Sequence, residues 1–390
     1  MQLVAYGAQD VFLTGKPEIS FFKVVYRRHT NFAMESIEQT FNGNPSLGNR
    51  VTCTISRNGD LVTNMWLEVE LDNTANLVNS VGHALIEYVE LEIGGQRIDK
   101  HYGEWLEAWS ELTLSEEKLS GFKEMIGRRD AGRTTAIESE KLYIPLQFFF
   151  CRNPGLALPL IALQYHEVKI NIKFRDPSYL QHGENAEKPT KFKSTPRLFA
   201  DYIYLDTDER RRFAQSSHEY LIEQLQHTGP EAVKSTGNYR LNFNHPVKEL
   251  VWVVRPTDND VLEFGTSELK VTQDNMIDFP WAKTSTDMFG TCKLQLNGHD
   301  RFTERSASYF RLVQPYQHHT RIPNKYVYCY SFALNPEAHQ PSGTCNFSRL
   351  DNVTLTLSNM TPPNGDVLIY AVSNNILRIM SGMGGLAYSN

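Results

Sequence analysis

The stretch His166-Glu-Val-Lys-Ile-Asn-Ile-Lys-Phe174 alternates polar and apolar side chains with a period of two. Successive side chains of a strand point to opposite faces of a sheet, so this pattern predicts a strand with one buried face. The stretches Val51–Arg57 and Met65–Leu71 follow the same period. Turn signals at Gly94-Gly95 and Asn297-Gly298 are spaced as an antiparallel sandwich or barrel requires.

The same stretch has a counterpart in the second half of the chain, Asp351-Asn-Val-Thr-Leu-Thr-Leu357. Two further pairs keep the same order along the chain: Ile37–Gly43 with Ile222–Gly229, and Leu91–Arg97 with Leu294–Arg301, the latter with one inserted residue. The offsets are 185, 185 and 203 residues. A conserved order with variable loop lengths indicates two diverged copies of one β domain.

Each copy of about 180 residues has room for eight strands, which favours a jelly roll over the shorter immunoglobulin domain. We therefore predict an all-β fold of two tandem eight-stranded antiparallel jelly-roll barrels with short inserted helices. The predicted boundaries are an N-terminal arm at 1–25, a first jelly roll at 26–212 and a second at 213–390. The charged run Asp206–Phe213 is interpreted as a linker or short helix between them.

One segment departs from the strand pattern. In Glu104–Arg129 the residues Leu119, Phe122 and Ile126 recur at helical spacing behind a candidate N-cap at Ser115. We expect one or two helices there, as an insertion at about 103–129 in the first jelly roll. The polar segment Asp176–Pro196 is predicted to be a loop.

Composition and charge exclude several classes of protein. With 41% hydrophobic and 22% charged residues the chain is neither disordered nor a coiled coil. The net charge of 39 − 45 = −6 argues against specific nucleic-acid binding. Five scattered cysteines indicate a reducing compartment, with Cys53 and Cys329 as core residues. No signal peptide is expected. The most apolar stretch, Leu142–Tyr165, is interrupted by three prolines and is therefore not expected to span a membrane.

No catalytic or metal-binding pattern stands out. Adjacent residues of a regular strand point to opposite faces of the sheet, so they cannot bind one metal ion together. This applies to the pairs His166-Glu167, His218-Glu219 and His318-His319. The carboxylate pairs Glu68/Glu70 and Glu90/Glu92 fit an ordinary solvent-facing strand. We predict no catalytic residue, no metal and no cofactor. A tandem β-sandwich that binds carbohydrate and a carbohydrate-active enzyme remain alternatives at this point.

Other local signals have structural interpretations. The N-glycosylation acceptor patterns at Asn346, Asn352 and Asn359 are interpreted as chance occurrences. The glycine-rich tail Gly382–Leu386 is interpreted as a tightly packed segment. The basic cluster Lys23–His29 is predicted to contact a membrane, nucleic acid or a carboxylate surface on a neighbouring subunit, with Lys23, Arg27 and Arg28 as the candidate contact residues.

Eight strings spread along the whole chain carry a family resemblance: Phe21–Phe32, Ile55–Leu61, Leu91–Tyr102, Pro154–Val168, Asp201–Asp206, Leu241–Pro246, Pro341–Ser348 and Leu377–Tyr388. They resemble the major capsid proteins of large icosahedral double-stranded DNA viruses (nucleocytoplasmic large DNA viruses), closest to the algal-virus (phycodnavirus) branch.

The resemblance implies a double jelly roll without enzymatic activity, which forms homotrimers. These pseudo-hexameric capsomers would tile the icosahedral shell of a virion that is assembled in the host cytoplasm. The implied partners are neighbouring capsomers, minor capsid proteins and, through the inner face, the internal viral membrane.

Overall fold

The computed structural model describes residues 5–72, 77–128, 141–180, 190–256, 287–360 and 365–388. The chain divides into two compact units, Met1–Phe32 and Ala33–Asn390. The first unit contains one short helix, α1 (Asp10–Thr14), which buries none of its own side chains. All other elements described below belong to the second unit, apart from the first residue of β1.

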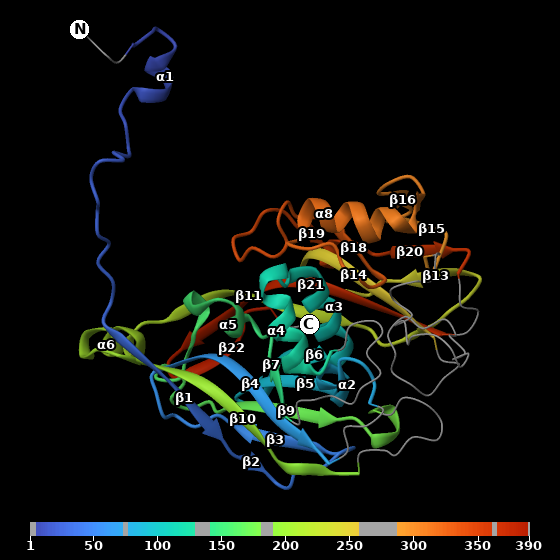
Figure 1. The fold of residues 1–390 in the computed structure, drawn as a ribbon, viewed down its shortest axis with the longest axis horizontal. Coiled ribbons are helices and arrows are strands. Elements are labelled where there is room, and N and C mark those ends of the chain that lie inside the picture. The colour runs from blue at the N-terminus through green and yellow to red at the C-terminus, as the bar shows by residue number, and fades with distance from the viewer. Residues whose placement is uncertain are drawn as a thin grey trace. The chain divides into compact units, whose positions relative to one another are not determined.

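The first lobe, up to Leu205, contains two antiparallel sheets (Figure 1). One has the order β1-β10-β4-β7, with β8 beside β4; these strands are β1 (Phe32–Gln39), β10 (Phe192–Leu205), β4 (Leu61–Leu71), β7 (Lys141–Pro145) and β8 (Leu158–Pro159). The other has the order β2-β3-β9-β5-β6; these are β2 (Phe41–Asn42), β3 (Arg50–Thr54), β9 (Val168–Phe174), β5 (Ile86–Ile93) and β6 (Gln96–Tyr102).

The second lobe, from His218 onward, also contains two antiparallel sheets. The larger one has the order β11-β21-β14-β18; its strands are β11 (His218–His227), β21 (Gly365–Met380), β14 (Pro246–Pro256) and β18 (Val327–Ser331), with β12 (Glu231–Ala232), β19 (Cys345–Asn346) and β22 (Met383–Leu386) attached. The smaller one has the order β13-β20-β15-β16; its strands are β13 (Thr236–Arg240), β20 (Val353–Ser358), β15 (Thr291–Leu296) and β16 (His299–Asp300), with β17 (Arg305–Ser306) beside β15.

The two lobes repeat one topology. The order β1-β10-β4-β7 corresponds to β11-β21-β14-β18, and β3-β9-β5-β6 corresponds to β13-β20-β15-β16. Each sequence pair falls on corresponding strands: the His166–Asp351 pair on β9 and β20, the Ile37–Ile222 pair on β1 and β11, and the Leu91–Leu294 pair on the β5–β6 and β15–β16 hairpins. The expected double jelly roll is therefore confirmed. One apolar core surrounds Leu67 and Ile170 of the first lobe and also includes Ile222, Leu377 and Ile379 of the second, and a separate core surrounds Trp252 and Leu355 of the second lobe.

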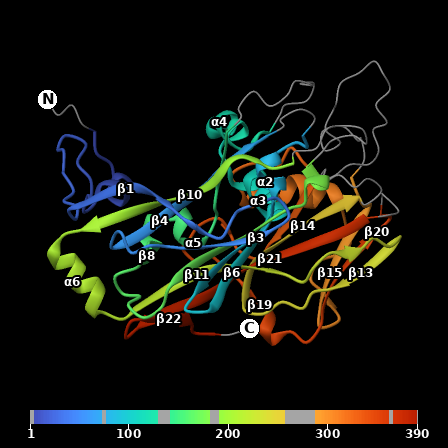
Figure 2. The same ribbon diagram turned by 90° about the horizontal axis from the view of Figure 1, so that it is seen from below.

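Apart from α1, the described helices follow one strand and precede another along the chain, as the colours of Figure 2 show. The predicted insertion forms α3 (Gly103–Thr113) and α4 (Glu116–Ile126), with Ser115 at the N-cap position and its predicted apolar residues buried. The predicted linker forms α6 (Thr207–Gln215), whose N-cap Asp206 accepts a hydrogen bond from Glu209 N–H. The remaining helical segments are α2 (Val81–Leu85), α5 (Phe149–Arg152), η1 (Pro154–Leu156), η2 (Pro177–Leu180), η3 (Tyr309–Val313), α8 (Gln314–His318) and η4 (Phe347–Arg349).

Two local expectations were wrong. The polar loop predicted at Asp176–Pro196 ends earlier, because β10 begins at Phe192, which pairs with Leu71 and packs its ring on Phe174. His318 and His319 lie at the end of α8 rather than in a strand. Both deviations arise from tertiary contacts that a local polar pattern does not report.

The β5–β6 hairpin provides a matched test of backbone geometry. Gly94 and Gly95 both have positive φ, 57° and 84°. A Cβ at Gly94 would overlap Nδ1 of His166, whereas a Cβ at Gly95 would meet nothing within 4 Å. We expect Gly95→Ala to cost about 1 kcal/mol of unfolding free energy, and Gly94→Ala to cost about 1–3 kcal/mol more. Urea denaturation of both variants measures the difference, and equal losses would contradict the clash.

Candidate functional site

Helix α3 joins the two lobes through an apolar face. Trp105, Ala108, Trp109 and Leu112 share one buried cluster with the outer face of the second lobe's larger sheet. The sheet contributes Val251 and Val253 from β14, Val327 and Cys329 from β18, and Leu368, Tyr370 and Val372 from β21. The Trp105 and Tyr370 rings lie 5.4 Å apart. A first-lobe helix thus covers the sheet of the second lobe.

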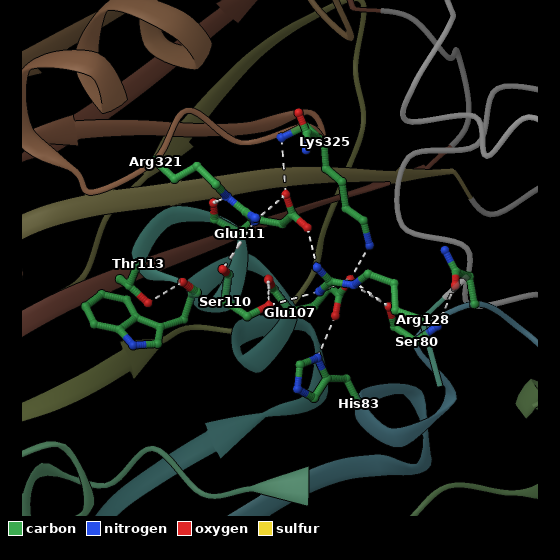
Figure 3. A network of polar contacts seen from close by, with 12 residues as sticks. Ser80, His83, Glu107, Ser110, Glu111, Thr113, Arg128, Arg321 and Lys325 are labelled. Carbon is green, nitrogen blue, oxygen red and sulfur yellow. Dashed lines mark hydrogen bonds and ion pairs between the residues drawn. The ribbon is translucent and has the colours of Figure 1, made fainter. Parts of the chain in front are cut away.

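A buried ionic network lies beside this apolar face (Figure 3). Glu107 of α3 is at its centre, with its side chain 2% exposed. Its Oε2 is 2.5 Å from His83 Nδ1. Its Oε1 lies 2.8 Å from Arg128 Nη2 and also contacts Nζ of Lys325. Since Lys325 belongs to the second lobe and the others to the first, one carboxylate links both lobes.

The same helix carries two more carboxylates of this kind. Glu111 Oε1 lies 2.5 Å from Arg128 Nη1, and Glu111 Oε2 lies 3.0 Å from Nη2 of Arg321 in the second lobe. Glu104 contacts Arg175 of the first lobe and lies 3.3 Å from Nη1 of Arg255 in the second. The acidic stripe of α3 therefore faces cations from both lobes.

The surroundings of Glu107 and His83 determine the protonation states of these two side chains. Burial by itself would raise the pKa of Glu107, but the cations of Arg128 and Lys325 outweigh burial and hold that pKa well below its usual range. Burial lowers the pKa of His83 despite the nearby Glu107. The imidazole is thus neutral near pH 7 and donates its Nδ1–H to the carboxylate. The ion pairs of Glu104, Glu107 and Glu111 with cations of the second lobe link the two lobes electrostatically, and together they are called the α3 clamp.

The neutral His83 predicts acid sensitivity. The pKa of His83 in the folded protein lies below the value of 6.5 in the unfolded chain. Its contribution to the free energy of unfolding is therefore fully present above pH 6.5 and is lost as the pH falls through the folded pKa. His83→Asn keeps a donor near the Nδ1 position but cannot titrate. We expect the melting temperature of wild type to fall more steeply than that of His83→Asn between about pH 7 and pH 5. Parallel pH profiles would contradict this role.

The predicted carboxylate pairs lie on outer sheet faces. Glu68 lies 2.5 Å from Arg197 Nη2 and 3.6 Å from Lys141 Nζ. Glu90 lies 3.1 Å from Arg50 Nη2 and 3.4 Å from Lys100 Nζ. They form cross-strand ion pairs.

The predicted histidine pairs also have structural partners. The Nδ1 of His166 lies 2.9 Å from Gly384 O, and the Nε2 of His218 lies 2.8 Å from Phe213 O. The side chain of His319 lies between two carboxylates, 2.9 Å from Oε2 of Glu249 and 2.9 Å from Oε1 of Glu337. Within the described ranges, no group of three or more His, Cys, Asp or Glu residues could hold a metal ion.

A cavity of about 170 Å³ lies where α5 meets the second lobe. Its charged lining is engaged within the protein: Arg152 lies 3.0 Å from Glu223, and Glu337 contacts His319. All five cysteines are free thiols, and burial raises the pKa of Cys53 to about 12. Of the helices described, none is long and apolar enough to cross a membrane.

The predicted contact residues Lys23, Arg27 and Arg28 lie in the unit Met1–Phe32, where all three are exposed. Their role stays a prediction. The residues that join the lobes were missed, although Glu104, Glu107 and Glu111 follow helical spacing. An acidic stripe on a helix ordinarily faces solvent, so the sequence offered no reason to bury it.

The sequence is similar to known capsid proteins. A family model described as the N-terminus of major capsid protein matches residues 20–206, and one described as large eukaryotic DNA virus major capsid protein matches residues 209–385. The major capsid protein of Pyramimonas orientalis virus is 53% identical, over all of this chain and 99% of the relative. The major capsid protein of Paramecium bursaria Chlorella virus 1 is 44% identical, with the same coverage.

The structure is also similar to solved structures of viral capsid proteins. It matches a chain of the quasi-atomic model of the PBCV-1 virus capsid with a TM-score of 0.83 and 41% identity, covering 95% of this chain and 100% of that one. The Faustovirus major capsid protein matches with a TM-score of 0.76 over 96% of this chain and 94% of the other. At 14% identity the latter likeness concerns the fold alone.

Proposed function

The chain belongs to the major capsid proteins of large eukaryotic DNA viruses, and on this premise we propose that three copies of it form a pseudo-hexameric capsomer of an icosahedral virion shell. Its role in the virion is structural, as a capsid protein. We propose further that it has no catalytic activity and that assembly takes place in the host cytoplasm.

The observation that supports the trimer best is the repeated topology. The sheet orders of the two lobes correspond strand for strand, so one subunit presents two similar shapes. Three such subunits arranged around a threefold axis present six similar lobes, which suits a hexagonal lattice. The α3 clamp supports this function because a tile must keep a fixed angle between its lobes. Apolar packing and buried ion pairs on α3 both oppose a hinge there.

The mass of the purified protein in solution tests the proposal. Three chains of 44.7 kDa give 3 × 44.7, or about 134 kDa, by light scattering after gel filtration. Negative-stain images should show six-lobed particles. A protein that stays at the single-chain mass at every concentration would overturn the trimer, whereas sugar binding on a glycan array without assembly would favour a lectin.

The N-terminal arm is proposed to mediate contacts outside the trimer. It carries Lys23, Arg27 and Arg28 together with exposed apolar residues such as Phe21 and Phe22. This mixture suits contacts with neighbouring capsomers, minor capsid proteins or the internal membrane at the inner face.

Deleting residues 1–25 is expected to leave both lobes folded, because their sheets begin at β1 (Phe32–Gln39). The melting temperature and the trimer mass should stay as in wild type, while association between capsomers weakens. The triple variant Lys23→Glu, Arg27→Glu, Arg28→Glu separates charge from apolar contact. Shell assembly that proceeds unchanged with the truncated chain would contradict the role of the arm.

A further inference from the structure

The second lobe contains a helix in the place that α3 occupies in the first. It runs from Ala307 through η3 and α8 to His318. Arg97 and Arg301, which close the matched hairpin segments, are 204 residues apart, and the same offset carries Gly103, where α3 begins, to Ala307. The two helices therefore follow their hairpins in the same register. Each also precedes a strand at the end of the corresponding sheet order, β7 in β1-β10-β4-β7 and β18 in β11-β21-β14-β18.

The side chains of the two helices correspond as well. Leu106 of α3 packs in the core of its own lobe, and its counterpart Phe310 packs in the core of the second. The residues of α3 that cover the neighbouring sheet, Trp105, Ala108, Trp109 and Leu112, correspond to Tyr309, Leu312, Val313 and Tyr316. Leu312 and Val313 are each 39% exposed, and Tyr316 is 76% exposed. The second helix thus presents an apolar face like that of α3 to solvent.

A matching sheet face exists on the first lobe. Strands β4 and β14 are both 11 residues long, and Trp66 and Val251 are the sixth residue of each. Trp66 pairs with Phe199 as Val251 pairs with Tyr370. Trp66 and Phe199 stack with ring centroids 5.6 Å apart and stay partly exposed. This aromatic pair occupies the position that α3 covers on the second lobe.

We propose that the helix 307–318 of one subunit docks through Leu312, Val313 and Tyr316 onto the Trp66–Phe199 face of a second copy of this chain. This proposal rests on the trimer proposed above and names its interface. The contact is head-to-tail, with one patch on the second lobe and another on the first. If it repeats the contact within the chain, six equivalent steps alternate between α3 and the helix 307–318 and close a ring.

The two joints differ in charge. The acidic residues Glu104, Glu107 and Glu111 of α3 correspond to Ser308, Arg311 and Pro315, so the second helix has no acidic stripe. Arg311 lies 2.7 Å from Asp287 of its own lobe. On the facing sheet, Glu68 is already paired with Arg197 and Lys141. Contact between folded subunits therefore requires few new charges to be buried, and we expect the trimer to persist in high salt.

Two complementary variants test the interface in the full-length protein. Tyr316→Asp alters the helix face, and Phe199→Asp alters the sheet face. Each should have the single-chain mass of 44.7 kDa where wild type is a trimer. The control Tyr179→Asp changes a tyrosine that is 44% exposed and lies on neither face, and it should stay trimeric. Circular dichroism melts verify folding; if either variant is unfolded, Tyr316→Ala and Phe199→Ala replace the pair and should raise the dissociation concentration at least tenfold.

Mixing the two Asp variants tests the head-to-tail geometry. The intact helix face of the Phe199 variant can dock on the intact sheet face of the Tyr316 variant, so the mixture should form heterodimers of 2 × 44.7, or about 89 kDa. Folded variants that stay trimeric, or a mixture that stays monomeric at all concentrations, would overturn this interface while leaving a trimeric wild type intact. A monomeric wild type would instead refute the proposed function itself.

Discussion

Glu107→Gln is expected to lower the free energy of unfolding by about 3–5 kcal/mol, because it removes the anion that buried Arg128 and Lys325 face. A neutral amide keeps the size of the side chain, so the loss reports charge rather than packing. Urea denaturation followed by tryptophan fluorescence measures it, since Trp105 and Trp109 lie on the same helix.

Glu90→Gln is the matched control. Glu90 also faces three cations, Arg50, Arg97 and Lys100, but the Arg50 and Arg97 side chains are 51% and 66% exposed. Exposed pairs of this kind contribute about 0–1 kcal/mol. Adding Lys325→Met to Glu107→Gln should restore part of the loss, because the buried cation is then removed as well. Equal destabilisation by Glu90→Gln and Glu107→Gln would show that the network does not clamp the lobes.

Trp109→Ala is expected to cost about 3–5 kcal/mol of unfolding free energy, because it leaves a cavity between α3 and the second lobe. The Trp109 side chain is 4% exposed and also lies under the guanidinium of Arg152, whose carbon is 4.9 Å from the ring centroid. Limited proteolysis should then cleave between the lobes faster than in wild type, since the contact of α3 with the second lobe is weakened.

Trp66→Ala serves as the counterpart, because Trp66 lies on the partly exposed sheet face of the first lobe. We expect it to retain most of the unfolding free energy of the single chain and to weaken the trimer instead. Trp109→Ala should show the opposite pattern at concentrations where the chain is folded. If both variants affected only chain stability, the correspondence between the two helix-on-sheet joints would be refuted.

Much of the fold followed from local patterns. Period-two segments such as His166–Phe174 and helical spacing at Leu119, Phe122 and Ile126 are set by backbone geometry, and both were found where expected. The charge run after Asp206 likewise became a capped helix. These signals are readable because they require only neighbours in the sequence.

The functional residues were less accessible to such reasoning. Glu107 and Glu111 are polar residues on a helix, and their burial depends on cations more than 200 residues away, Lys325 and Arg321. His319 was expected in a strand and instead lies between Glu249 and Glu337. Burial of a charge is favourable only when its partners are already positioned, so no single segment encodes it.

Strand periodicity and long family strings are properties of consecutive residues, so a duplicated β protein of the capsid family could be predicted without a structure. Only the three-dimensional packing shows that α3 joins one lobe to the other while the equivalent helix at 307–318 keeps its apolar face exposed. The physical reason is that both helices carry an apolar face in the same register, but only the first has a second lobe of its own chain to cover.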